Sequence, residues 1–181
     1  MKRRCLTIFA IVLSAALQAV PMATEDEALA ALQSATTVTE KEAACRRLKE
    51  TGSVKAVPAL KALLADESLA QWAADALATL PAREAGEALL EALPHLPPKP
   101  KALVAFALGT RREAAAVKSL TGLLADPDSM LAVAAAKALG RIGDAASLAA
   151  LRTAKADTLG SIRIAVNDAL LACADQRLAA G

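Results

Sequence analysis

The residue types that most often carry enzyme chemistry are few in this sequence and poorly placed for it. The single histidine, His95, excludes the metal motifs that need two histidines. There is also no glycine-rich phosphate loop and no nucleophile elbow. The acidic pairs Glu25/Glu27 and Asp126/Asp128 are explained by the preference of helix N-termini for negative charge. We therefore predict no catalytic residues, no metal site and no cofactor.

The first residues have the layout of a secretory signal peptide. Residues 1–4 carry the positive charge, and residues 5–17 form an apolar run, shorter than the about 20 residues that span a membrane. We expect residues 1–23 to be the signal, with cleavage after Ala19 or Ala23. An uncleaved N-terminal anchor is the alternative. The protein is then expected to be periplasmic or secreted.

The charge of the chain depends on this segment. Lys2, Arg3 and Arg4 hold three of the 21 basic residues, so the remainder has 18 basic against 19 acidic residues and a net charge of −1. A protein without a basic excess lacks the electrostatic signature of nucleic-acid binding. We expect no nucleic-acid partner, and no membrane contact beyond the N-terminal signal.

Composition predicts helices. The chain is 55% hydrophobic but only 2% aromatic, and alanine and leucine supply most of the apolar residues. Both are strong helix formers, whereas strands favour β-branched and aromatic residues.

Ala-Leu pairs recur at a fixed interval, with leucines 31 residues apart at Leu77, Leu108, Leu139 and Leu170. A second series precedes the first, at Leu29, Leu60, Leu89, Leu120 and Leu151.

The interval divides residues 24–181 into repeats of two helices each. The units are about 24–52, 53–81, 82–112, 113–143 and 144–175. In the fourth unit, a turn at 126–129 precedes an apolar helical stripe, and Gly140 and Gly143 mark the end of that helix. One helix pair cannot bury both of its stripes, so the units must stack.

Three segments carry a resemblance to a known family: "AAAKALGRIGDAASLAAL" (134–151), "TGSVKAVPALKALLAD" (51–66) and "SIRIAVNDAL" (161–170). They resemble the HEAT repeat as found in bacterial proteins, the type also called phycobilin-lyase HEAT-like. The resemblance implies an all-α fold: a right-handed α-α superhelix, or HEAT-like solenoid, of about five antiparallel helix pairs. It also implies a non-catalytic scaffold that binds another protein. An accessory or lyase-like role beside an enzyme or a cofactor-carrying partner is the alternative.

The repeat assigns one outward-facing position to each unit, two residues before the Ala-Leu leucine. It holds Arg46, Asp75, Phe106, Lys137 and Asp168. An exposed aromatic side chain among charges is typical of an interface anchor. We predict a concave protein-binding surface that comprises Lys101, Phe106, Lys137, Arg141 and Arg163. The alternative is that Phe106 packs onto its own repeat.

In the family, an arginine often lies seven residues before the same leucine, near the inner ridge, and pairs with an acidic turn residue. The position holds Lys41, Ala70, Lys101, Ala132 and Arg163 here. By resemblance, an ion pair of Arg163 with Asp157 or Asp126 is expected, as a structural ladder rather than a ligand site.

The stretch "LPHLPPKPKA" (93–102) is predicted to be a turn within unit three, because the interval from Leu89 to Leu108 equals that of units one, four and five. His95 is then a turn residue, and Pro97 and Pro98 form the turn. Trp72 is expected to fill the core of unit two, whose turn is two residues shorter.

Cys45 and Cys173 lie four repeats apart, so about 30–40 Å separates them at ordinary helix spacing. A disulfide between them is excluded at that distance. Two buried thiols are expected, with intermolecular pairing as the alternative.

The final helix is unusually apolar for the end of a solenoid, where a polar outer face is the rule. Its apolar residues are Ile162, Ile164, Val166, Leu170 and Leu171. A self-associating structural module, with a homo-oligomer formed through this helix, is therefore a further alternative.

Overall fold

The computed structural model describes residues 24–157 and 160–179, so the predicted signal peptide at 1–23 lies outside the described residues. Ten α-helices and three short 3₁₀ helices make up this part of the chain. The α-helices are α1 (Glu25–Ser34), α2 (Val38–Thr51), α3 (Val57–Ala62), α4 (Ala70–Thr79), α5 (Arg83–Ala92), α6 (Pro98–Arg111), α7 (Val117–Leu123), α8 (Ser129–Ile142), α9 (Ala145–Asp157) and α10 (Gly160–Ala179). The 3₁₀ helices are η1 (Val54–Ala56), η2 (Leu93–His95) and η3 (Ala114–Ala116).

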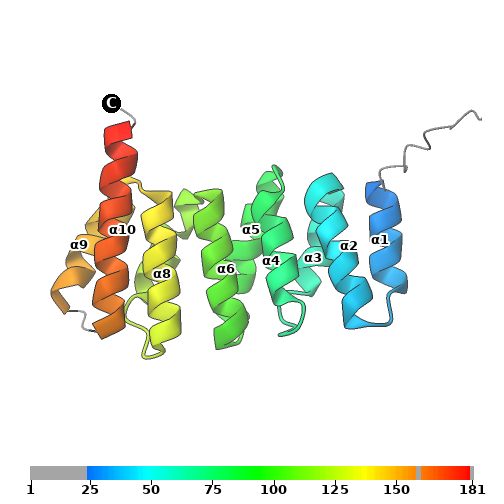
Figure 1. The fold of residues 1–181 in the computed structure, drawn as a ribbon, viewed down its shortest axis with the longest axis horizontal. Coiled ribbons are helices and arrows are strands. Elements are labelled where there is room, and N and C mark those ends of the chain that lie inside the picture. Colours follow the sequence, from blue (N-terminus) through cyan, green and yellow to red (C-terminus); the bar gives the residue numbers. More distant parts are fainter. Residues whose placement is uncertain (1–23, 158–159, 180–181) are drawn as a thin grey trace, which may run out of the picture.

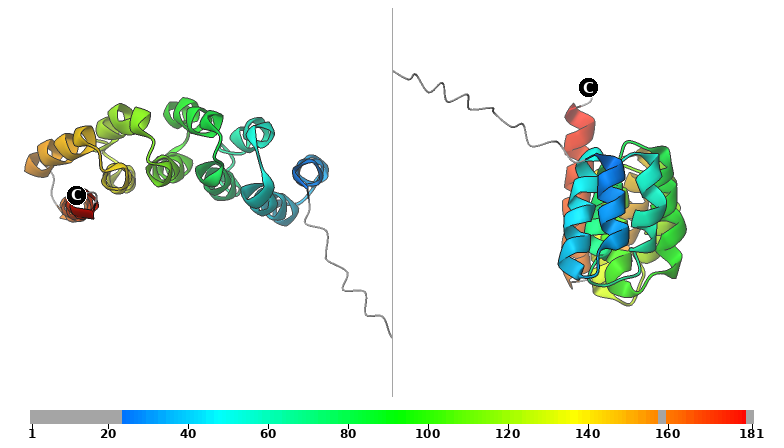
Figure 2. Two further views of the ribbon diagram at one scale, coloured as in Figure 1. Left: turned by 90° about the horizontal axis from the view of Figure 1, so that it is seen from above. Right: turned by 90° about the vertical axis from the view of Figure 1, so that its right-hand side faces the viewer.

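The helices form two rows (Figure 1). The second helix of each pair packs against the second helix of the next, so α2, α4, α6, α8 and α10 form one continuous row. Seen from above, this row follows the inner, concave side of a curved array, and α1, α3, α5, α7 and α9 follow the outer side (Figure 2, left). The predicted all-α, HEAT-like solenoid of helix pairs is confirmed.

The core repeats with the sequence. Most leucines of the two series are fully buried, namely Leu60, Leu77, Leu89, Leu108, Leu120, Leu139 and Leu151. Leu29 and Leu170, in the two outermost described units, are only partly buried. The leucines therefore fill the space between the rows, as stacking requires.

Two glycines allow the inner row to pack closely. A Cβ atom on Gly109 of α6 would lie 2.6 Å from the Cα of Ala138, and one on Gly140 of α8 would lie 2.8 Å from the Cα of Ala169. The prediction that Gly140 ends its helix is wrong, because α8 continues to Ile142 and Gly143 caps it in the left-handed conformation with φ 69°. Gly140 is needed for helix–helix contact instead.

The proline-rich stretch connects α5 to α6. Its first part forms η2, where His95 is exposed, and Pro97 is the N-terminal cap residue of α6. Pro98 is the first residue of the helix rather than part of the turn, a position where a missing N–H has no cost. His95 is thus a surface residue between two packed helices.

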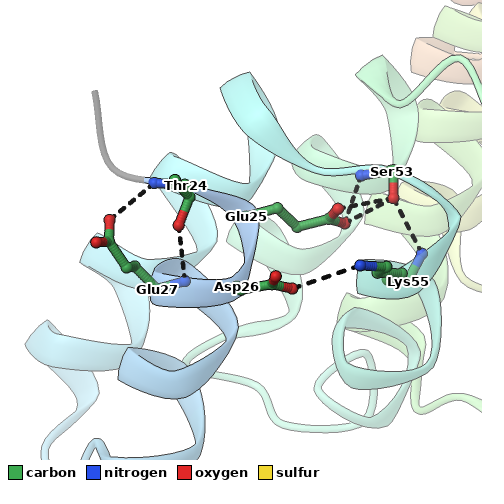
Figure 3. Close-up of polar contacts among 6 residues, drawn as sticks. All are labelled: Thr24, Glu25, Asp26, Glu27, Ser53 and Lys55. Carbon is green, nitrogen blue, oxygen red and sulfur yellow. Dashed lines mark hydrogen bonds and ion pairs between the residues drawn. The ribbon is translucent and has the colours of Figure 1, made fainter. Parts of the chain in front are cut away.

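A carboxylate joins the first helix to the second unit (Figure 3). Glu25 of α1 accepts hydrogen bonds from the Ser53 amide at 2.6 Å and from the Ser53 hydroxyl at 2.8 and 2.9 Å. These hydrogen bonds hold the pKa of Glu25 below its ordinary 4.5, and the bond from the Ser53 amide has the largest effect. Nearby, Asp26 forms an exposed ion pair with Lys55 at 3.6 Å.

The Glu25 contact should depend on pH. The pKa of the Glu25 carboxyl is lower in the folded protein than in the unfolded chain. Its contribution to the free energy of unfolding is therefore complete above about pH 4.5 and is lost as the pH falls through the lower pKa of the folded protein. We expect hydrogen-exchange protection of the Ser53 amide to fall in this acidic range, and Glu25→Gln to remove that dependence. Asp26→Asn is the control, because an exposed ion pair contributes little. If both variants changed the pH dependence of this protection equally, Glu25 would not be the group responsible for it.

Candidate functional site

The inner row presents one exposed side chain per helix at the predicted outward position. Arg46, Asp75, Phe106, Lys137 and Asp168 are all exposed, and they lie on α2, α4, α6, α8 and α10 in turn. In α4, α6 and α8 the position faces outward because the alanine and leucine that follow it are buried in the core. Side chains from neighbouring helices therefore meet along the concave side.

Phe106 and Arg141 meet in this way. The Arg141 guanidinium of α8 lies 3.7 Å from the centroid of the Phe106 ring on α6, within the range of a cation–π contact. Its Nη1 also donates a hydrogen bond to the hydroxyl of Thr110 at 3.1 Å. Phe106 remains 44% exposed. The alternative that Phe106 turns onto its own repeat is therefore excluded, and its ring is held in place at the surface.

Two hollows adjoin the Phe106 ring. The larger has a volume of about 410 Å³ and is lined by Asp75, Phe106, Gly109, Thr110, Arg112, Arg141 and Gln176. The smaller, of about 210 Å³, is lined by Gln71, Ala74, Asp75, Ala78, Leu103, Phe106, Ala107 and Thr110. Phe106 lines both, so an incoming side chain in either hollow would contact this ring. We call these two hollows and the ring between them the Phe106 site.

The charge of the Phe106 site is positive. Arg112 and Arg141 both line the larger hollow. The one acidic group there, Asp75, forms an ion pair with Lys49 at 2.6 Å, so its charge is already balanced. The site therefore favours a partner that brings negative charge.

Arg112 has an unusual backbone. It is the C-terminal cap of α6 with φ 54°, the single non-glycine residue with positive φ among the described residues. Gly143 holds the corresponding position 31 residues later, at the end of α8. An L-residue in this conformation costs about 1–2 kcal/mol relative to glycine. Sequence reasoning missed Arg112, although its alignment with Gly143 in the 31-residue repeat was a signal that could have found it.

The other three predicted surface residues lie elsewhere. Lys137 is exposed on α8, and none of Lys101, Lys137 and Arg163 lines either hollow. Lys101 is half-buried, because its position in the repeat faces neighbouring helices: Ala70 and Ala132, the equivalent residues, are fully buried. The structure therefore brings together Phe106 and Arg141, with Arg112 as a third member.

Arg163 lies on a different side of α10. It precedes Leu170 and Arg177 by seven and fourteen residues, so the three share one helix face, and the latter two line a groove against α9. The structure has no ion pair between Arg163 and Asp126. Asp126 instead accepts a hydrogen bond from the Asp128 amide at 2.9 Å, as Asp66 does from the Ser68 amide. The side chain of Asp157 lies outside the described residues.

A second arginine that sequence reasoning missed has a structural role. Arg111, the last residue of α6, donates from Nη1 to the carbonyl of Leu77 and from Nη2 to that of Ala82, both at 2.9 Å. It also donates to the carbonyl of Leu80, which caps α4. A cation at a helix C-terminus satisfies carbonyls that have no helical partner. Arg111 therefore fastens the end of α4 to α6.

Neither of the two cysteines in the described part of the chain offers a reactive group. Cys45 and Cys173 are fully buried and unpaired with each other, as the repeat spacing predicts. Burial raises the pKa of the Cys45 thiol to about 11, and burial likewise raises that of Cys173.

Trp72 packs partly on the core, and the Arg46 guanidinium lies 4.3 Å from the centroid of its ring.

Across residues 24–157 and 160–179, no group of three or more histidine, cysteine or acidic side chains is arranged to hold a metal ion. Within the same ranges, no helix combines the length and apolar character that crossing a membrane requires.

Comparison with known proteins supports the architecture. A family model described as HEAT repeats matches residues 86–171, from α5 into α10. The chain is a HEAT-like helical solenoid. The match supports a HEAT-repeat protein, and HEAT repeats are generally scaffolds for protein interaction that are typically non-catalytic. Phe106, Arg112 and Arg141 all fall within the matched residues. A comparison with curated proteins gives no match.

Proposed function

We propose that this HEAT-like solenoid is a non-catalytic scaffold that binds another protein through the Phe106 site on its concave side. The observation that carries the proposal is the exposed Phe106 ring, held by Arg141 between two hollows. Rigid aromatic and arginine side chains are the usual anchors of protein interfaces. The partner is expected to insert an apolar side chain beside Phe106 and to place a carboxylate near Arg112 and Arg141.

The chemistry of the hollows favours a scaffold over a lyase-like or accessory role. Handling a reactive cofactor needs titratable groups that are free to act. Asp75 is the one acidic side chain that lines the hollows, and it is paired with Lys49.

The conformation of Arg112 supplies a test in which stability and binding change in opposite directions. Arg112→Gly is expected to raise the free energy of unfolding by about 1 kcal/mol, because glycine adopts positive φ without strain. The same change should weaken partner binding by about tenfold, because it removes a charged hydrogen-bond donor. Thermal unfolding gives the first quantity, and cross-linking in cells with mass spectrometry gives the second.

Two further variants complete this experiment. Phe106→Ala should reduce the same cross-links without lowering stability, because the ring is largely at the surface. Lys118→Ala, which removes an exposed charge from α7 on the outer row, should change neither quantity. If Phe106→Ala and Arg112→Gly left every cross-link intact, the Phe106 site would not be the binding surface.

We further propose that the scaffold is exported, with residues 1–23 as its signal and the Phe106 site facing partners in the cell envelope. The layout of the first 23 residues supports this. Fractionation of cells that express the chain should place it in the envelope or the medium. Recovery from the cytosol alone would contradict export without touching the proposal for the Phe106 site.

A further inference from the structure

Three large apolar side chains are exposed along one line of α10. Ile164 is 63% exposed, Leu171 65% and Leu178 81%, and they are spaced by seven residues. Residues at this spacing share one face of a helix, as in a two-stranded coiled coil. The opposite face of α10, with Ala165, Ala169 and Cys173, is buried. We call the line of Ile164, Leu171 and Leu178 the α10 seam.

The seam lies between flanks of opposite charge. Asp168 and Asp175 follow Ile164 and Leu171 by four residues, which places them on one flank. Arg163 and Arg177 precede Ile164 and Leu178 by one residue, which places them on the other. All four are exposed, and none has an ion-pair partner among the described side chains.

The basic flank extends into a groove. A hollow of about 560 Å³ between α9 and α10 is lined by Leu148, Arg152, Leu170, Ala174 and Arg177. Arg152 of α9 therefore adds a positive charge beside those of α10. A partner helix that covers the seam would place one of its own flanks over this groove.

We propose that the α10 seam binds a second copy of this chain, with the two α10 helices side by side and parallel. In a parallel pair, the residue before the first seam position faces the partner's residue five positions later. Arg163 of each copy then meets Asp168 of the other, and each acidic flank faces the basic groove of its partner. An antiparallel pair would bring arginine against arginine and aspartate against aspartate. The charges therefore select the parallel arrangement.

The position of α10 allows this contact. It lies at one end of the array, beside α8 and α9, and the C-terminal end of this helix projects beyond α8 (Figure 1). The dimer would extend the array in two directions and leave both Phe106 sites free. Formation of this dimer does not depend on protein binding at the Phe106 site.

Sedimentation equilibrium of the purified chain tests the association. We expect a reversible dimer whose dissociation constant rises at least about tenfold in Leu171→Asp, because a charge replaces a seam residue. Met130→Asp is the control, since it places the same charge on another exposed apolar residue, at the start of α8. A monomer at the highest soluble concentration, or a dimer that resists Leu171→Asp, would overturn the proposal.

Two variants test the orientation. Arg163→Glu should weaken the dimer, and Arg163→Glu with Asp168→Arg should restore it, because the swapped charges again face each other in a parallel pair. Leu178→Cys, in a chain with Cys5→Ser, should form a disulfide between copies under oxidising conditions, because equivalent seam positions adjoin only when the helices are parallel. Failure of the swap to restore the dimer, or absence of the disulfide in a dimeric variant, would overturn the parallel arrangement.

Discussion

Gly140→Ala is expected to lower the free energy of unfolding by about 2 kcal/mol or more, even though alanine is the better helix former by about 1 kcal/mol. The new Cβ would lie 2.8 Å from both the Cα and the Cβ of Ala169. Backbone atoms of a packed helix cannot move aside as a flexible side chain can, so α8 and α10 would have to separate. Gly109→Ala, at 2.6 Å from the Cα of Ala138, should cost at least as much. Thermal and denaturant unfolding measure both.

A third glycine is the matched control. A Cβ on Gly122 of α7 would meet nothing within 4 Å. Gly122→Ala should therefore leave stability unchanged or raise it by up to about 1 kcal/mol. If all three substitutions had the same effect, helix propensity rather than the approach of neighbouring helices would govern these positions.

These glycines show where sequence reasoning reached its limit. The 31-residue interval predicted most of the buried leucines, because burial on one side of a helix follows directly from spacing. It could not tell a glycine that ends a helix from one that admits a neighbouring helix, since both choices lie near the C-terminus of the same segment. Gly140 and Gly143 differ only in their backbone conformation and in what faces them.

The same limit applies to the Phe106 site. The interval predicted that Phe106 faces outward, and Phe106 and Arg141 were both among the predicted surface residues. The contact between them depends on the distance between α6 and α8, which spacing along one chain does not give. The expected pair of Arg163 with Asp126 is absent because a short aspartate side chain finds its nearest donor in its own turn.

Spacing along the sequence also does not separate the roles of two adjacent arginines. Arg111 and Arg112 are indistinguishable by residue type, yet one is half-buried and fastens α4, and the other is exposed and lines the larger hollow. Their roles diverge because α6 ends between them, so the chain turns and the two side chains leave in different directions. The sequence alone does not fix the last residue of a helix closely enough to separate them.

Arg111→Ala is the second substitution with a large expected effect. It removes a cation that donates hydrogen bonds to the carbonyls of Leu77 and Leu80, at the end of α4, and to that of Ala82, which also accepts from the Ala85 amide at 3.2 Å. Hydrogen bonds to charged groups contribute about 1.5–3 kcal/mol each, and the partial exposure of this side chain reduces their sum. We expect the free energy of unfolding to fall by about 3 kcal/mol in thermal and denaturant unfolding.

Two comparisons separate the geometry of Arg111 from its charge. Arg111→Lys keeps the charge, but an ammonium group cannot span three carbonyls as the planar guanidinium does, so an intermediate loss is expected. Arg83→Ala removes an exposed arginine whose ion pair with Glu87, at 2.7 Å, lies within one helix, and it should cost no more than about 0.5 kcal/mol. If Arg111→Ala were as mild as Arg83→Ala, the end of α4 would be held by the buried leucines alone. If Arg111→Lys were fully stable, charge at the helix C-terminus rather than the three directed hydrogen bonds would account for the contact.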